Sequence, residues 1–167
     1  MDKDEKIILA ELQNNAQESI DMLAKRCGFS RQKVWRIVKR LEKTRLIWGY
    51  TAIIDEKKND MNHYTLLIKR TTKKLDEKTI DIITSRKIEN NGTNIGVTIE
   101  NSYYVNGEYD WIITFTARDL ILAKKFCEML LALHPGVIEK TILLETLFSI
   151  KNHYILNPES KKLREFI

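Results

Sequence analysis

The chain has 167 residues, of which 43% are hydrophobic and 31% are charged, and its net charge is +5. This length allows one domain or two small ones, and the apolar fraction is sufficient for hydrophobic cores. No apolar run approaches the ~20 residues of a transmembrane helix, and the charged first residues lack a signal-peptide core, so we expect a soluble cytoplasmic protein. Cys27 and Cys127 show no metal-binding or redox spacing, and we expect two small buried side chains rather than a disulfide.

Three short helices are predicted at the start of the chain. The first spans residues 5–14, and its apolar face is expected to cover the two helices that follow. Ser19 can cap a second helix that ends at Gly28, and Ser30 can cap a third. The third helix repeats apolar residues at helical spacing, which predicts one buried stripe of Val34, Ile37, Val38 and Leu41. Two short helices joined by a tight turn indicate a helix-turn-helix.

Residues 25–45 concentrate positive charge. The stretch holds a single acid, Glu42, and nine basic residues: Lys25, Arg26, Arg31, Lys33, Arg36, Lys39, Arg40, Lys43 and Arg45. Its net charge of +8 exceeds that of the whole chain, so the remainder is net negative. Such a local surplus on a capped helix favours a surface that binds a polyanion such as DNA over a merely solvated helix. This assignment would fail if the helix were buried or if acids of the same molecule neutralised its cations.

A strand and a hinge are predicted to follow. Residues 48–54 alternate Trp48, Tyr50, Ala52 and Ile54 on one side, which is typical of a strand. Residues 55–62 are charged and nearly free of hydrophobic side chains, which indicates a domain boundary. The predicted division is 1–47 for a helix-turn-helix domain, 48–62 for a linker strand and hinge, 63–157 for a second domain, and 158–167 for a tail with a short helix.

The second domain has the predicted order strand, helix, strand, strand, helix, strand. Strands are expected at 63–70, 95–105, 109–117 and 138–150, and helices at 76–87 and 119–134. Turn residues predict a loop at 89–94 and a hairpin at Asn106-Gly107. This βαββαβ order is that of the ferredoxin-like fold, in which both helices lie on one face of an antiparallel sheet. The fold class is therefore α+β.

The strands of this domain carry apolar residues on both faces, although helices are expected on one face only. Ile112 alternates with Trp111 and Ile113, and the last strand is apolar on both sides at Ile142, Leu143, Leu144, Leu147 and Phe148. A large exposed apolar face is unusual in a soluble monomer. We therefore expect a second copy of the chain to bury it.

Several motifs in one order resemble the Lrp/AsnC (feast/famine) family of bacterial and archaeal transcription regulators over residues 4–158. They are Leu23-Ala24, Gly28-Phe29-Ser30, Val34, Leu41-Glu42, the segment 46–55, Gly107-Glu108-Tyr109-Asp110, Arg118-Asp119 and Leu133-His134-Pro135-Gly136-Val137. The resemblance implies a winged-type helix-turn-helix domain, a linker strand and a ferredoxin-like effector-binding domain. It also implies homodimers, and tetramers or octamers built from them. The chain departs from the family at Ile37, where Arg is usual, and at Arg45, where Gly is usual.

The resemblance places the third helix in the major groove of double-stranded DNA, starting at its cap Ser30. Base edges are then expected to be read by Gln32, Lys33 and Arg36, because Arg and Lys suit guanine and Gln suits adenine. Phosphate contacts, which position the protein without reading sequence, are expected from Arg31, Lys39, Arg40 and Lys43. Trp35 is expected either to contact a sugar or a thymine methyl group, or to pack at the helix edge.

The resemblance also implies an amino-acid effector. Asp110 would pair with its amino group and Gly107 would let the backbone approach closely, or these residues simply form the turn, with glycine supplying a positive φ. Tyr109 fits the core better than a ligand site. Amino-acid-binding members often carry two threonines where this chain has Lys140 and Ile142, and Thr141 is one position off, on the opposite side of a strand.

No catalytic motif is present. His63, His134 and His153 lie at unrelated positions, and there is no P-loop, zinc-protease helix or nucleophile elbow. We therefore expect no enzyme, no metal and no cofactor. Siroheme decarboxylases, which resemble the same two-domain architecture, are the alternative, but the basic helix favours DNA. A metabolite-sensing module that binds no DNA is disfavoured by the same charge.

Overall fold

The computed structural model describes all 167 residues and contains two compact units. Unit 1 comprises Met1–Ile54 and Ser149–Ile167, and unit 2 comprises Asp55–Phe148. The C-terminal residues thus belong to the unit in which the chain begins, whereas the sequence predicted a second domain that runs to residue 157. Each unit has its own hydrophobic core. None of the helices combines the length and the apolar character that crossing a bilayer requires.

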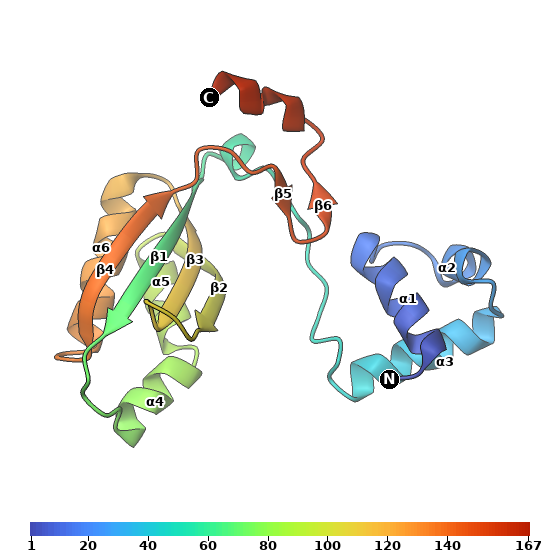
Figure 1. Cartoon of the computed structure of the whole chain (residues 1–167), viewed down its shortest axis with the longest axis horizontal. Helices are drawn as coiled ribbons and strands as arrows, with labels where there is room; N and C mark the ends of the chain where they lie inside the picture. Colours follow the sequence, from blue (N-terminus) through green and yellow to red (C-terminus); the bar gives the residue numbers. More distant parts are fainter. The chain divides into compact units, whose positions relative to one another are not determined.

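Unit 1 begins with the predicted three helices (Figure 1), which are α1 (Lys3–Asn14), α2 (Ile20–Cys27) and α3 (Arg31–Lys43). Their apolar faces meet in one buried cluster made of Ile8, Leu12, Leu23, Ala24, Val34, Ile37, Val38 and Leu41. The stripe predicted for the third helix is therefore confirmed. All four of its members are at most 6% exposed.

Local hydrogen bonds start α2 and α3 at the predicted caps, whereas α1 starts two residues earlier than predicted. The Ser19 hydroxyl accepts from the Met22 N–H, and the Ser30 hydroxyl accepts from the Lys33 N–H. Asp2 caps α1 in a reciprocal pair with Glu5, each carboxylate accepting from the backbone N–H of the other. Gly28 ends α2 at a φ of 68°, a left-handed conformation that glycine adopts without a steric cost.

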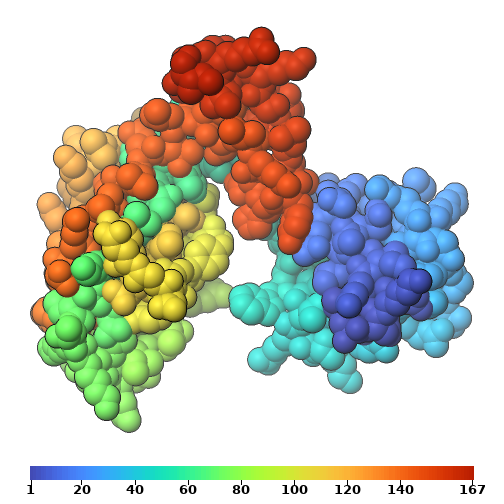
Figure 2. Space-filling view, in the orientation of Figure 1, coloured from blue at the N-terminus to red at the C-terminus, as the bar shows by residue number.

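The segment after α3 forms no strand, contrary to the prediction for residues 48–54. Its alternating side chains are exposed to solvent. Trp48 is 94% exposed, and Tyr50 and Ile54 are each slightly more than half exposed. Figure 2 shows this cyan segment at the surface. The sequence pattern specifies the alternation of side chains, but a strand also needs a neighbour to share its hydrogen bonds. The single chain supplies no such neighbour here.

The end of the chain adds three small elements to unit 1, which are β5 (Lys151–Asn152), β6 (Ile155–Leu156) and the 3-10 helix η2 (Ser160–Glu165). The side-chain amide of Gln13 on α1 donates to the Tyr154 hydroxyl at 2.9 Å. That hydroxyl belongs to the β5–β6 turn. η2 occupies the predicted terminal helix as a tighter 3-10 turn, and the hairpin before it has no counterpart among the predicted elements.

Unit 2 is a four-stranded antiparallel sheet in the order β2-β3-β1-β4. Its elements are η1 (Glu56–Asn59), β1 (Asn62–Arg70), α4 (Glu77–Thr84), α5 (Lys87–Asn94), β2 (Val97–Tyr104), β3 (Trp111–Ala117), α6 (Leu120–Leu133) and β4 (Ile138–Glu145). Both long crossings pass over the same face of the sheet, where α5 and α6 lie (Figure 1). This is the predicted ferredoxin-like arrangement, with its first helix divided into α4 and α5.

The prediction of a loop at 89–94 is wrong, because these residues form most of α5. Their turn-forming side chains have low helix propensity, but packing overrides that preference. Gly92 lies against the core, and a Cβ atom placed there would be 3.3 Å from the Val97 carbonyl oxygen and 3.5 Å from the Phe126 ring. Glycine therefore lets α5 approach β2 and α6 closely.

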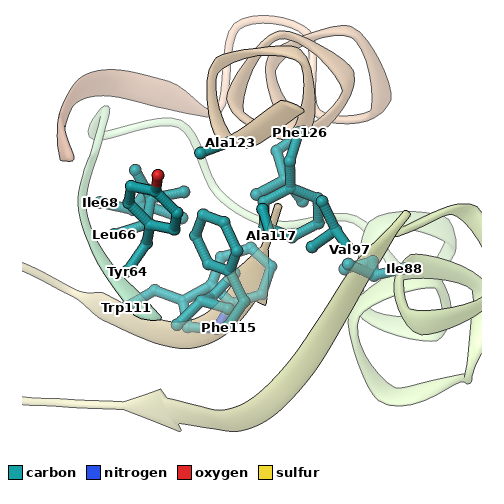
Figure 3. Packing of buried hydrophobic residues seen from close by; sticks show 12 residues of the cluster. Tyr64, Leu66, Ile68, Ile88, Val97, Trp111, Phe115, Ala117, Ala123 and Phe126 are labelled. Atoms are coloured by element: carbon teal, nitrogen blue, oxygen red, sulfur yellow. The ribbon is translucent and has the colours of Figure 1, made fainter. Parts of the chain in front are cut away.

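The core of unit 2 lies between the sheet and its helices (Figure 3). Phe115 on β3 is central to it, with its ring centroid 4.7 Å from that of Phe126 on α6 and 5.6 Å from that of Tyr64 on β1. Cys127 lies at the edge of this core as a free thiol, and burial raises its pKa to about 11. Cys27 is likewise free.

The other face of the sheet carries no helix. The strand register places Tyr103, Ile112, Leu67 and Ile142 in one row across it, with Leu144 beside them. Leu143 points the opposite way and packs against the core. The bare face is therefore apolar at its centre, as predicted, and we call this set of five residues the outer apolar row.

An ion pair near the start of β1 ties the sheet together. The Nε2 atom of His63 lies 3.0 Å from a carboxylate oxygen of Glu100, the residue that bulges out of β2, and its Nδ1 atom lies 2.7 Å from the Thr146 hydroxyl. The hydrogen bond to Glu100 raises the pKa of His63, against the opposing effect of burial. The protonated imidazole is therefore favoured in the folded state.

We predict that this pair makes the stability of unit 2 depend on pH. Its contribution should be complete below the pKa of about 6.5 of an unfolded histidine and should vanish as pH rises through the higher folded pKa. Glu100→Gln should therefore lower the free energy of unfolding by up to about 1 kcal/mol at pH 6 and much less at pH 9. Urea titrations at both pH values measure this difference, and an equal loss at both would contradict it.

Candidate nucleic-acid interface

One face of α3 is turned to solvent because the opposite face is buried. At 100° per residue, Gln32, Arg36, Lys39 and Lys43 fall within about 60° of one another, on the side opposite the buried stripe. All four are exposed. We call this set the outward stripe of α3. It is long, cationic and free of apolar side chains, which suits contact with a polyanion.

Acids of unit 1 pair with five of the nine cations of residues 25–45. The pairs are Arg26 with Glu11 and Glu18, Arg31 with Asp21, Lys33 with Asp4, Lys39 with Glu42, and Arg40 with Asp2 and Glu5. Only Glu42 lies within the basic stretch itself. The other acids come from α1, α2 and the residues around them, so folding reduces the charge surplus that the sequence showed.

This pairing is incomplete. No acid pairs with Lys25, Arg36, Lys43 or Arg45, and residues 1–54 hold eleven basic and seven acidic residues, a net charge of +4. The paired side chains on α3 remain 39–75% exposed. Exposed pairs of this kind contribute little to stability and exchange readily with other anions. α3 is therefore neither buried nor fully neutralised.

The pairs also show which way the flanking side chains face. Lys33 and Arg40 turn toward the start of α1, and the Lys33 ammonium lies 2.6 Å from Asp4 and 4.1 Å from the centroid of the Phe29 ring. Arg31 turns toward α2. Of the three predicted base readers, Gln32 and Arg36 thus lie on the outward stripe, whereas Lys33 lies on its flank. Trp35 is 52% exposed on the other flank.

The C-terminal end of α3 carries a feature that the sequence prediction did not assign. The N–H of Leu46 donates to the Leu41 carbonyl and the N–H of Arg45 donates to the Glu42 carbonyl. This pair of bonds is the Schellman motif, in which Arg45 takes the position usually occupied by glycine. Its φ is 58°, and a left-handed conformation costs a residue with a Cβ atom roughly 1–2 kcal/mol.

Glu42, the acid nearest to this end, is fully engaged. One carboxylate oxygen accepts from the Lys39 ammonium at 2.8 Å and the other accepts from the Tyr50 hydroxyl at 3.1 Å. The hydrogen bond from Lys39 is the main reason why the pKa of Glu42 lies below its usual value. The bond to Tyr50 also holds the segment after α3 against the helix.

Three of the four residues predicted to contact an effector, Gly107, Tyr109 and Asp110, lie in the loop between β2 and β3, whereas Thr141 lies on β4. Asp110 ties its loop to β1, because its carboxylate accepts from the Arg70 N–H at 2.8 Å and its own N–H donates to the Ile68 carbonyl. Thr141 pairs with Ile68 on the helix-covered side, so β1 separates it from β3. Tyr109 is half-buried in the loop.

The expectation that Gly107 supplies a positive φ in the turn is wrong. It is absent from the glycines with positive φ, and a Cβ atom placed there would meet no atom within 4 Å. Neither backbone conformation nor packing in this chain explains a glycine at the tip of the loop.

Residues 1–47 match the family described as winged helix-turn-helix DNA-binding. No curated protein sequence matches the chain.

Solved structures match both units together. An AsnC family transcriptional regulator from Agrobacterium tumefaciens has a TM-score of 0.68 and 19% identity, and the match covers 95% of this chain and 98% of that one. The chain has the Lrp/AsnC fold. AsnC of E. coli matches with a TM-score of 0.62 and 19% identity, over 93% of this chain and 97% of that one. A feast or famine regulatory protein from M. tuberculosis, complexed with L-methionine, matches with a TM-score of 0.69 and 20% identity. This match covers 90% of this chain and 95% of that one.

Proposed function

We propose that this Lrp/AsnC-fold protein is a sequence-specific regulator of transcription that binds double-stranded DNA through α3. The observation that carries the proposal is the outward stripe of α3, which faces solvent in a domain that matches the helix-turn-helix DNA-binding family. A helix of this kind fits the major groove, which is about 12 Å wide.

The structure supports different roles for different side chains of α3. Gln32 and Arg36 lie where base edges would be met first, and neither has an acid partner to displace. Lys39 and Lys43 continue the stripe toward the phosphates. On the flanks, Arg31 can exchange its exposed partner Asp21, and Arg40 its exposed partner Asp2, for phosphate groups. Lys33 would have to leave Asp4 and Phe29 before it could contact DNA.

We predict that Arg36→Ala removes discrimination at one base pair. A bidentate contact between arginine and guanine is worth about 1–3 kcal/mol against the wrong base. Gel-shift titrations should compare an operator selected from random duplexes with its single-base variants. Arg31→Ala is the matched control, since the loss of a phosphate contact weakens binding to all sequences alike. Wild-type affinity and specificity in the Arg36 variant would contradict the proposed role.

A homodimer is the second part of the proposal. The outer apolar row presents Leu67, Ile112 and Ile142 on a face that no helix covers, and the segment after α3 has an unpaired backbone. A second copy could bury the row and place two α3 helices about 34 Å apart, the spacing of successive major grooves. Tetramers or octamers would then be assemblies of such dimers.

Ile142→Lys is predicted to produce a monomer, because it places a charge in the middle of the row. Sedimentation at micromolar concentration should show a dimer for the wild type. Ala132→Lys on the exposed side of α6 adds the same charge away from the sheet and should leave the dimer intact. A wild-type monomer under these conditions would exclude this interface.

An amino acid or a related small metabolite is the proposed effector of unit 2. The proposal rests on the L-methionine complex of a protein with the same fold and on Gly107, which local structure does not require. A ligand that packs against the loop would explain the missing side chain.

At least one of the twenty amino acids is expected to raise the melting temperature of the wild type in a thermal-shift screen. Gly107→Leu should fold normally, because the added side chain enters open space, and should lose that shift. A flat screen of the wild type would leave the loop with a structural role only.

The enzyme alternative gains nothing from the structure. His63 is paired with Glu100, His134 is buried at the end of α6 with its Nδ1 bonded to the Leu130 carbonyl, and His153 belongs to unit 1. Both histidines of unit 2 therefore already have structural partners.

A further inference from the structure

We propose that Arg45 is a phosphate-binding residue, fixed at the end of α3 so that it clamps the DNA backbone beside the major groove. The inference rests on the proposed DNA binding. Arg45 would add a phosphate contact at a position where the left-handed backbone favours glycine over any residue with a side chain.

The first support is the backbone of Arg45. The Schellman motif closes α3 with two hydrogen bonds that need no side chain at this position. A glycine would satisfy the same bonds without the steric penalty of the left-handed conformation. Strained residues of this kind tend to occur where a side chain has a function.

The second support is the charge of Arg45. Its guanidinium is exposed and has no acid partner. Glu42 is the only acid between Asp21 and Asp55, and both of its oxygens are already bound by Lys39 and Tyr50. Arg45 therefore forms no ion pair in unit 1, and its charge acts there only on the dipole of α3, a weak effect at an exposed helix end. Its side chain is free to meet an anion from outside the molecule.

The third support is length. The 13 residues of α3 extend over about 20 Å, whereas the major groove is about 12 Å wide. If the N-terminal half of α3 enters the groove, as in helix-turn-helix complexes, a helix of this length that crosses the groove carries its last turn to the groove edge. That turn then faces the phosphate backbone, which arginine binds through its forked guanidinium.

The experiment compares Arg45→Gly with Arg45→Lys and with the matched control Lys6→Gln, which removes one exposed charge from α1. Arg45→Gly should melt at or above the temperature of the wild type, because glycine relieves the strained backbone. A loss of binding by this variant therefore cannot be attributed to unfolding. Each protein is titrated with a mixed-sequence duplex and with the selected operator at several salt concentrations.

Arg45→Gly should weaken binding to both duplexes by about tenfold at low salt. It should also reduce the slope of log affinity against log salt by roughly 0.9, the value for one phosphate contact. Arg45→Lys should retain most of the wild-type slope, and Lys6→Gln should retain the full wild-type slope. If the wild type binds DNA and Arg45→Gly keeps the same affinity and slope, the inference is wrong while the proposed function stands. If the wild type binds neither duplex, the proposed function fails as well.

Discussion

Burial of the apolar stripe of α3 is the constraint on which the rest of unit 1 depends. Val34, Ile37, Val38 and Leu41 are almost completely buried against α1 and α2, and burying each such side chain is worth about 1.5–3 kcal/mol. Exposed ion pairs contribute far less. Packing, rather than charge, therefore sets the rotation of the helix about its axis. Arg36 and Lys43 face outward because the apolar stripe on the opposite side of α3 is buried.

The helices that the sequence predicted correctly are those with a purely local cause. A side-chain cap such as Ser30 and an apolar repeat such as that of α6 act within one or two turns, so their effect can be deduced from the residues themselves. α5 could not be predicted in this way. Its residues favour a turn, and they become helical only because Gly92 fits against Phe126 and Val97, which come from other elements.

The charges of unit 1 show the same difference: their surplus could be predicted from the local sequence, but their ion-pair partners could not. The composition of residues 25–45 predicted a cationic surface, and α3 presents one. It could not predict that Arg40 would meet Asp2, 38 residues away, or that Lys33 would turn to Asp4. These contacts depend on how α1 crosses α3. The left-handed conformation of Arg45 could be expected, because the family that the sequence resembles usually has glycine at this position. Only the structure shows that the hydrogen bonds and the left-handed backbone persist without glycine.

The free energy of specific DNA recognition favours two copies of α3 over one if α3 reads bases as proposed. Specific binding typically exceeds non-specific binding by about 4–10 kcal/mol. The two proposed base readers, Gln32 and Arg36, would supply roughly 2–6 kcal/mol at about 1–3 kcal/mol each. A second copy would double this contribution, whereas further cations such as Arg45 would raise affinity for every sequence equally. In the proposed dimer, the apolar face of unit 2 and the stripe of α3 would thus serve one requirement, because a second copy on the sheet face would double the base contacts that make binding specific.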